Sequence, residues 1–466
     1  MALTAGCGST VRQRGALSTD EGLSPTTAPA VDGGLGETPD GPAASAAGSP
    51  GARASATRTG GTTRAASAAV KGSIELGFIT TAVSNAGALG FATGQSFTDR
   101  QVFDAVVAEY NARGGMAGRK IVPIFANTDT AATSWDSQFQ AACAQFTQDN
   151  KVQAVLGYVF VFLDNFEQCL ARASVAHFYG GYQPGDGRAQ KDFPTLVSTA
   201  HPTVDIADLT VFKGAVQSRL LTPATKLGVL IDNCAHGRRA FDASAAYLKA
   251  QHIDYELVEM SCASGSGDVT SASATISNAE LRFATRGVDV VAAGGVALLV
   301  FMAAAESQGY HPTYLTSAGG AALEPNAPSA QLAKLHGFGW LPAVDVNQGH
   351  QPGPRSAAQQ ACLGMLQKHG LTPTGYNDFM IAYTTCDSMA LYEQALIRTG
   401  GRSAATDVVP AALASMPTFL GAAPYGGRLT STVSQRGGAA QWREWGWAGD
   451  CSCFTYRGSA YPIPSL

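Results

Sequence analysis

The chain has 466 residues, of which 45% are hydrophobic and 14% are charged, and its formal net charge is −4. This length accommodates two or three domains. The small net charge is spread along the chain without a basic stripe, which argues against a nucleic acid partner. No apolar run reaches about 18 residues, so no segment of the sequence is predicted to span a membrane.

The first residues read MALTAGCGS. They resemble the lipobox of bacterial lipoproteins, in which small residues precede a cysteine that is lipid-modified after cleavage. The small residues before Cys7 fit this pattern, whereas Thr4 stands where an aliphatic residue is commoner. The apolar run of a signal peptide is missing upstream, and a true start codon further upstream would explain this. The resemblance therefore implies that residues 1–7 are a truncated signal remnant and that Cys7 is the lipidation site.

Residues 8–71 are rich in Gly, Ala, Pro, Ser and Thr, with scattered charges and no apolar periodicity. A segment of this composition cannot bury enough apolar surface to offset the entropy lost on ordering. We therefore expect a disordered linker that tethers the folded part to the cell envelope.

From Gly72 onward, short apolar runs alternate with segments of helical spacing. Such alternation predicts parallel strands covered by helices on both faces. Nearly 400 residues of this pattern exceed one sheet, so we expect an α/β protein with two doubly wound parallel-sheet lobes. The predicted strands are 74–79, 120–125, 152–156, 176–179, 227–231, 255–259 and 288–292, and the predicted helices are 95–112, 134–149, 166–173, 239–251, 271–285 and 296–308.

Apart from Cys7, the chain has eight cysteines, an even number that falls in chain order into four neighbouring pairs. None shows the C-x-x-C spacing of a zinc site. Disulfides and an oxidising compartment fit this count best. Unrelated buried thiols are the alternative, because free cysteine packs well in cores. The candidate disulfide cysteines are Cys143, Cys169, Cys234, Cys262, Cys362, Cys386, Cys451 and Cys453.

Several stretches together resemble type I periplasmic binding proteins, and in particular their branched-chain amino acid-binding group. Each is weak alone, and their order and spacing carry the resemblance. They are NARGGMAGRK at 111–120, VLG at 155–157, VLID at 229–232, VDVVAAGG at 288–295 and the long helix expected at 376–399.

The resemblance implies an extracytoplasmic solute-binding protein that closes two lobes on a small molecule by hinge bending. It further implies delivery to an ABC permease, a monomer and no cofactor or metal. Three hinge crossings are expected near 199–202, 317–320 and 425–428. These boundaries assign 72–201 and 320–426 to lobe one, and 202–319 and 427–466 to lobe two.

Carrying over the family's ligand-contacting positions gives nine candidate ligand-binding residues, on loops at the carboxyl ends of strands and on the hinge-proximal helix. Amino acid binders of this family hold the ligand ammonium with an acidic side chain in lobe two, after the two glycines at 294–295. Here VALL follows, without a carboxylate. A buried unpaired ammonium is costly, so a less polar or larger solute is favoured. The nine candidates are Asn85, Tyr158, Val159, Phe160, Gly181, Tyr182, His236, Val296 and Tyr376.

Other interpretations remain for several of these residues. Phe160 could pack in the core, and His236 could lie in a surface loop. The cluster Trp442, Trp445 and Trp447 is expected to pack a C-terminal hairpin. We find no nucleophile elbow, HExxH, P-loop or dinucleotide-binding motif, so an enzyme is not expected. A ligand-sensing ectodomain of the same fold is the alternative to a transport component.

Overall fold

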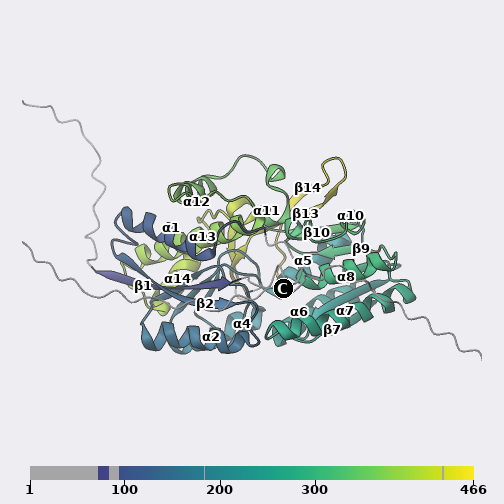
Figure 1. The fold of residues 1–466 in the computed structure, drawn as a ribbon, viewed down its shortest axis with the longest axis horizontal. Helices are drawn as coiled ribbons and strands as arrows, with labels where there is room; N and C mark the ends of the chain where they lie inside the picture. Colours follow the sequence, from purple (N-terminus) through teal and green to yellow (C-terminus); the bar gives the residue numbers. More distant parts are fainter. Residues whose placement is uncertain (1–71, 83–93, 183, 433–434) are drawn as a thin grey trace, which may run out of the picture. The chain divides into compact units, whose positions relative to one another are not determined.

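The computed structural model describes residues 72–82, 94–182, 184–432 and 435–466. The predicted lipidation site Cys7, the linker 8–71 and the candidate ligand residue Asn85 lie outside these ranges. The described chain forms two seven-stranded sheets, each with helices on its faces, which confirms the predicted two-lobed α/β fold (Figure 1).

The first sheet, in lobe one, has the strand order β11-β12-β5-β4-β3-β1-β2. Its pairs are parallel except for β11 with β12. The strands are β1 (Ser73–Ala82), β2 (Lys120–Asp129), β3 (Ala154–Gly157), β4 (Ala176–Tyr179), β5 (Leu196–Ser198), β11 (Leu429–Ser431) and β12 (Arg436–Ala439). The helices of this lobe are α1 (Asp99–Ala112), α2 (Trp135–Ala144), η1 (Gln145–Asp149), α3 (Asp164–Arg172), α4 (Gly187–Asp192), α12 (Ala357–Gln367), α13 (Tyr376–Arg398) and α14 (Ala405–Ser415).

The second sheet, in lobe two, has the order β14-β13-β10-β9-β8-β6-β7. Its strands are β6 (Leu227–Asp232), β7 (Tyr255–Met260), β8 (Val290–Ala292), β9 (Thr313–Thr316), β10 (Leu335–Gly339), β13 (Gln441–Ala448) and β14 (Cys453–Pro462). The helices are α5 (Val204–Gln217), α6 (Ala235–Ala250), α7 (Ser266–Arg286) and α8 (Gly295–Ser307), with the short α9 (Gly320–Leu323), α10 (Ser329–Leu332), α11 (Pro342–Asp345) and η2 (Gln348–His350). The short turn η3 (Tyr425–Gly427) stands in the chain between α14 and β11.

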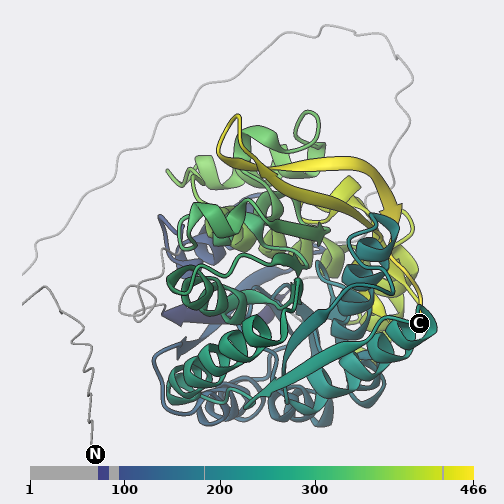
Figure 2. The same ribbon diagram turned by 90° about the vertical axis from the view of Figure 1, so that its right-hand side faces the viewer.

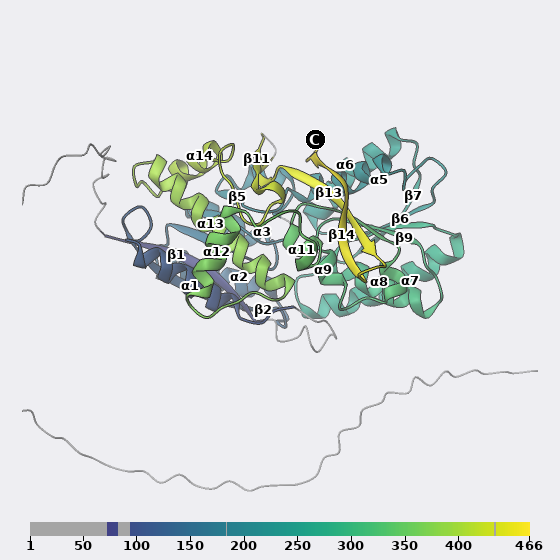
Figure 3. The ribbon, with the colours of Figure 1, turned by 90° about the horizontal axis from the view of Figure 1, so that it is seen from above.

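The two sheets share one topology, because the first five strands of each follow the order 2-1-3-4-5. Each sheet is extended at its far edge by two later strands, β12 and β11 in lobe one and β13 and β14 in lobe two. The β13–β14 hairpin is antiparallel to β10 and runs along the edge of the second sheet, as the yellow ribbon in Figures 2 and 3 shows.

Two of the three predicted crossings lie elsewhere in the structure. The segment 335–339, predicted within lobe one, forms β10 of the second sheet, so the chain returns to lobe one only after Gly339. Strands β11 and β12, predicted within lobe two, extend the first sheet beside β5, so the last crossing follows Ala439. The physical reason is that strands β10 and β12 are short and contain glycine, so their sequences show no alternation typical of a strand. Hydrogen bonds to the neighbouring strands determine which sheet they join. The first passage, from β5 to α5, contains the predicted segment 199–202.

Local signals account for several element boundaries. Thr98 caps α1, where its hydroxyl accepts from the Gln101 amide at 3.2 Å and the Gln101 side chain accepts in return from the Thr98 amide. Gly287 ends α7 in the left-handed conformation, with φ of 65°. Of the three tryptophans of β13, Trp442 and Trp445 are buried and Trp447 packs against Phe454, so they pack the hairpin as predicted.

All eight cysteines outside the N-terminal segment are joined as neighbours in sequence. The bonds are Cys143–Cys169, Cys234–Cys262, Cys362–Cys386 and Cys451–Cys453. The first bond links α2 to α3, and the third links α12 to α13. Disulfides between successive helices reduce the conformational freedom of the unfolded chain.

Candidate ligand-binding site between the lobes

The loops at the carboxyl ends of the two sheets contact each other. The Trp135 amide donates to the Ser264 carbonyl at 2.7 Å, and the Ser266 amide donates to the Ala132 carbonyl at 2.9 Å. Residues 130–134 follow β2, and residues 261–265 follow β7. Further along the interface, Asp186 of the loop before α4 accepts two hydrogen bonds from Arg239 of α6. In open α/β sheets, ligands bind beyond the carboxyl ends of the strands. In this protein, the carboxyl ends of the strands of one lobe face those of the other.

In lobe one the order of the strands reverses between β1 and β3, and the loop after β3 begins at Tyr158. The Tyr158 ring meets the Tyr182 ring edge to face, with centroids 6.3 Å apart. The ring centroids of Tyr182 and His201 are 5.1 Å apart, and those of His201 and Trp340 are 6.0 Å apart. These side chains form an aromatic cluster of Tyr158, Tyr182, His201, Trp340 and Tyr376.

Tyr376 joins this cluster through the start of α13. Its phenol lies near those of Tyr158 and Tyr182 and adds to the rise of their pKa values, to which burial contributes most. The neighbouring turn is fixed by Asp378, which accepts from the Ser96 hydroxyl at 2.6 Å and from the Gly375 amide at 3.1 Å. At Gly94 the φ is 58° and a Cβ would lie 2.6 Å from the Tyr376 ring, so glycine lets the segment approach the ring.

The cluster has no net charge near neutral pH. Burial raises the pKa of Tyr158 and of Tyr182 above the ordinary value, and raises the pKa of Tyr376 to about 12. Burial raises the pKa of the nearby Asp99 to about 6, although the Thr81 and Arg100 amides that donate to its carboxylate act in the opposite direction. The phenols can therefore serve as neutral hydrogen-bond donors to a ligand.

His201 provides a further donor. It lies in the first segment that passes between the lobes and is 4% exposed. Burial lowers the pKa of its imidazole to about 3, so the ring is neutral. Its Nδ1 accepts from the Trp340 indole at 3.2 Å, which places the proton on Nε2. Within the described ranges Nε2 has no hydrogen-bond partner. A buried donor of this kind is expected to be satisfied by a ligand or water.

Lobe two supplies carboxylates from α5 and β6. Asp205 accepts from the Gly187 amide of lobe one at 2.9 Å, so the first turn of α5 faces the loop after β4. Asp208 follows one turn later. Burial, and then repulsion by Asp232 and Asp205, raises the pKa of Asp208 to about 8. At neutral pH its carboxyl group is mainly protonated and can donate a hydrogen bond.

The structure brings three of the nine candidate residues together, namely Tyr158, Tyr182 and Tyr376. Val159 is 1% exposed in the lobe-one core, and its carbonyl lies against Gly181, where a Cβ would clash. Phe160 packs against Trp135 and Phe139 of α2, which matches its alternative interpretation as a packing residue.

The remaining candidates of lobe two lie at the ends of helices. His236 is in the first turn of α6 and meets Phe162 of lobe one edge to face, at 5.6 Å. Val296 is in the first turn of α8 and is 45% exposed. Neither residue belongs to the aromatic cluster. His236 follows β6 and Val296 follows β8, the two strands between which the strand order of lobe two reverses.

Sequence reasoning missed His201, Trp340 and Asp208. His201 stands within the predicted first crossing, and Asp205 and Asp208 recur one helical turn apart directly after it. Trp340 follows β10, which the sequence did not predict as a strand. Its position beside His201 depends on the pairing of β10 with β9 and β13.

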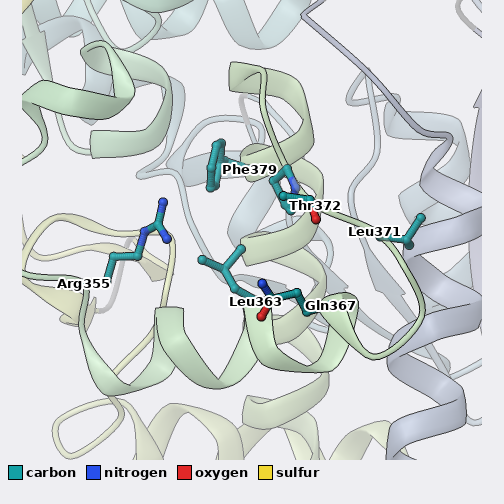
Figure 4. Close-up of a pocket in the computed structure, with 7 residues that line it drawn as sticks. Arg355, Leu363, Gln367, Leu371, Thr372 and Phe379 are labelled. Carbon is teal, nitrogen blue, oxygen red and sulfur yellow. The ribbon is translucent and has the colours of Figure 1, made fainter.

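A separate small cavity of about 130 Å³ lies between α12 and α13, and its lining includes no residue of the aromatic cluster. Figure 4 shows Leu363 and Gln367 on α12 and Phe379 on α13 at its walls. Sites for small organic ligands usually have at least about 300 Å³. This cavity is therefore too small to be the main binding site.

A family model described as periplasmic binding protein matches residues 73–442. The chain belongs to this family. No curated protein sequence matches it well enough to count as a relative. Among the described residues of this periplasmic binding protein, no helix is long and apolar enough to cross a bilayer.

Solved structures of ABC-transporter solute-binding proteins share the fold. One, from Rhodopseudomonas palustris and in complex with 3,4-dihydroxybenzoic acid, is 15% identical, with a TM-score of 0.57 over 84% of this chain and 98% of that one. Another R. palustris solute-binding protein, in complex with benzoate, is 13% identical, with a TM-score of 0.59 over 84% and 98% of the two chains. A leucine-binding protein from Thermotoga maritima is 13% identical, with a TM-score of 0.60 over 84% and 99%.

Proposed function

We propose that this periplasmic binding protein captures a small aromatic carboxylic acid between its lobes and delivers it to an ABC permease. The observation that carries the ligand class is the neutral aromatic cluster, in which the buried His201, with its unpaired Nε2 donor, lies beside Tyr182, and Tyr182 in turn meets Tyr158. Aromatic walls suit an aromatic ring, and neutral donors suit a carboxylate. Some proteins of the same fold are known in complex with benzoate and hydroxybenzoates.

The protonation of Asp208 supports this choice over an amino acid. An amino acid ammonium requires an ionised partner, whereas the raised pKa of Asp208 keeps its carboxyl group mainly neutral at pH 7. A protonated Asp208 can instead donate to a ligand oxygen. Residues 294–299, which form the N-cap and first turn of α8, contain no carboxylate, and this also argues against an ammonium partner there.

The cellular setting is part of the proposal. Cys7 would carry the lipid anchor and residues 8–71 would act as the tether, with the two lobes on the outer face of the cytoplasmic membrane. The four disulfides suit an oxidising compartment. We propose a monomer that alternates between open and closed lobes, with the permease recognising the closed form.

Isothermal titration calorimetry of the purified protein tests the ligand class. We expect benzoate or 4-hydroxybenzoate to bind with one site per chain and to raise the melting temperature by mass action. Leucine serves as the matched amino acid, and benzamide as the aromatic ligand without a carboxylate. If leucine binds and no aromatic acid does, the ligand is an amino acid and the proposed ligand class is wrong. The absence of binding across solutes of both classes would argue for a different function.

A further inference from the structure

The turn of the β13–β14 hairpin carries two cysteines separated by one residue. Cys451 and Cys453 flank Ser452, whose φ of 49° lies in the left-handed region. Cys453 begins β14 and pairs in register with Ala448 of β13. Cys451 is exposed to solvent and Cys453 is buried. One sulfur of this disulfide is therefore accessible to a thiol.

A histidine is held beside this turn by the preceding segment. The Phe454 amide donates to the Asn347 side-chain oxygen at 2.8 Å, and the Asn347 amide donates to the Phe454 carbonyl at 3.4 Å. The His350 amide in turn donates to the Asn347 carbonyl at 2.8 Å. These bonds tie the η2 turn to β14 one residue beyond Cys453. The position of His350 is thus set by backbone contacts that do not involve the sulfurs.

Possible metal ligand atoms gather at this point. A ring nitrogen of His350 and the two sulfurs lie within 4.8 Å of one another. Two sulfurs bound to one tetrahedral Zn²⁺ are roughly 3.8 Å apart, from a Zn–S distance of about 2.3 Å. Once the disulfide is reduced, small side-chain rotations would bring all three ligand atoms to one ion. The single residue between the cysteines keeps the two thiols together.

We propose that Cys451, Cys453 and His350 form a zinc site that is available only in the reduced protein. Two equivalents of an external thiol reduce the Cys451–Cys453 bond, giving two protein thiols and the oxidised disulfide of the reductant. Zn²⁺ then binds both sulfurs as thiolates and the neutral imidazole, and the two thiol protons are released. A water molecule completes the tetrahedron, as in three-ligand zinc sites. In the reverse direction, an external disulfide accepts two electrons from the two thiolates, which re-forms the Cys451–Cys453 bond, gives two external thiolates and releases Zn²⁺.

The other disulfide beside a histidine provides the internal comparison. Asp232, Cys234 and His236 also lie within 4.8 Å of one another. There the bond joins residues 28 positions apart on two loops, and only one sulfur belongs to the group. Reduction at that place leaves a single thiolate with a carboxylate and an imidazole, a weaker donor set for Zn²⁺ than two thiolates. The hairpin is therefore the better zinc site.

Competition titration with a chromophoric zinc chelator tests the proposal on the full chain. The protein is reduced with a phosphine under nitrogen, freed of reductant and titrated with Zn²⁺, and the oxidised protein is titrated in parallel. We expect one additional equivalent of Zn²⁺ in the reduced form, with thiolate-to-metal charge-transfer absorption when Co²⁺ replaces Zn²⁺. In C451S/C453S this equivalent disappears. In H350A its affinity falls by about tenfold or more.

Matched variants separate this site from other thiols. C234S/C262S removes the comparison group and is expected to keep the additional equivalent, and Cys7 is common to all variants. H311A changes another exposed histidine and should leave the affinity unchanged. Equal Zn²⁺ binding by the wild type and C451S/C453S would overturn the proposal, as would equal binding before and after reduction. Far-ultraviolet circular dichroism of each variant checks that it is folded, so that a lost equivalent of Zn²⁺ can be assigned to the missing ligand atoms.

Discussion

Arg239 of lobe two donates two hydrogen bonds to Asp186 of lobe one, from Nε at 2.6 Å and from Nη2 at 2.8 Å. Burial acts to raise the pKa of Asp186, but the hydrogen bonds from Arg239 outweigh it and hold that pKa below the usual range. This bidentate contact joins the two lobes in the structure. We expect it to form when the lobes close on a ligand and to break when they open.

Replacement of Arg239 by alanine should therefore destabilise the closed form. Ligand affinity depends on the fraction of molecules that can close, so we expect the Kd for the bound solute to rise by about three- to tenfold. Calorimetry measures this change. R238A is the matched control, because Arg238 pairs with Asp242 and Glu259 inside lobe two. An equal loss of affinity in both variants would show that the Arg239 contact has no special part in closure.

Tyr158 and Phe160 allow a test of which side of the loop after β3 meets the ligand. Tyr158 faces Tyr182, whereas Phe160 packs on Trp135 and Phe139. We expect Y158A to weaken binding of an aromatic acid by about tenfold or more, in line with the loss of one aromatic contact and one donor. F160A should lower the melting temperature and change the Kd little. The reverse pattern would place the ligand on the Phe160 side.

Asp208 should make the protein less stable as the pH rises. Its pKa is raised from 3.8 to about 8 in the folded protein, so between these values the folded state binds more protons than the unfolded state. Stability therefore falls between about pH 4 and pH 8 and levels off above. D208N removes this contribution and should stabilise the protein at pH 8 by on the order of several kcal/mol, less whatever solvent screening of the half-buried side chain takes away.

Urea unfolding of D208N from pH 5 to pH 9 gives the measurement, and D242N serves as an exposed control. Some slope should remain in D208N, because burial also raises the pKa of Asp345 and of Asp387 to about 7. A slope as steep as that of the wild type would mean that Asp208 titrates normally.

A buried pair in the core of lobe one should be costly to break. Glu167 and His177 are both fully buried, and His177 Nδ1 lies 2.8 Å from the Glu167 carboxylate. E167A leaves the imidazole without this partner, and we expect a loss of about 3 kcal/mol in the free energy of unfolding. D192A, which breaks the exposed contact with Arg188, should change it by less than about 0.5 kcal/mol. Chemical denaturation of the two variants provides the comparison.

The disulfides should differ in their contribution to stability. The Cys362–Cys386 bond spans 24 residues, and the Cys451–Cys453 bond spans two. Loop-closure entropy predicts a loss of about 3 kcal/mol when the first is removed and about 1 kcal/mol for the second. Thermal unfolding of C362A/C386A and C451A/C453A measures both. A larger loss for the second pair would show that the hairpin turn depends on its bond for more than chain entropy.

Much of the architecture follows from the sequence by itself. The apolar run 74–79 and the helical spacing of 99–112 are local patterns, and burial of one face is enough to determine the element. The even count of cysteines favoured disulfides over free thiols, whereas the pairing of neighbours was left open by the sequence and is given by the structure. The glycines at 114–115 follow α1 with φ of 102° and 81°, conformations that few other residues adopt.

The tertiary structure alone decided where the chain changes lobe and which side chains meet. Strands β10 and β12 are short and contain glycine, so their hydrogen-bond partners, which lie far away in sequence, fix their sheet. The contact of His201 with Trp340 joins residues 139 positions apart. The raised pKa of Asp208 likewise depends on Asp232, which comes close only in the folded chain. Local patterns determine elements, whereas long-range pairing and burial determine the site.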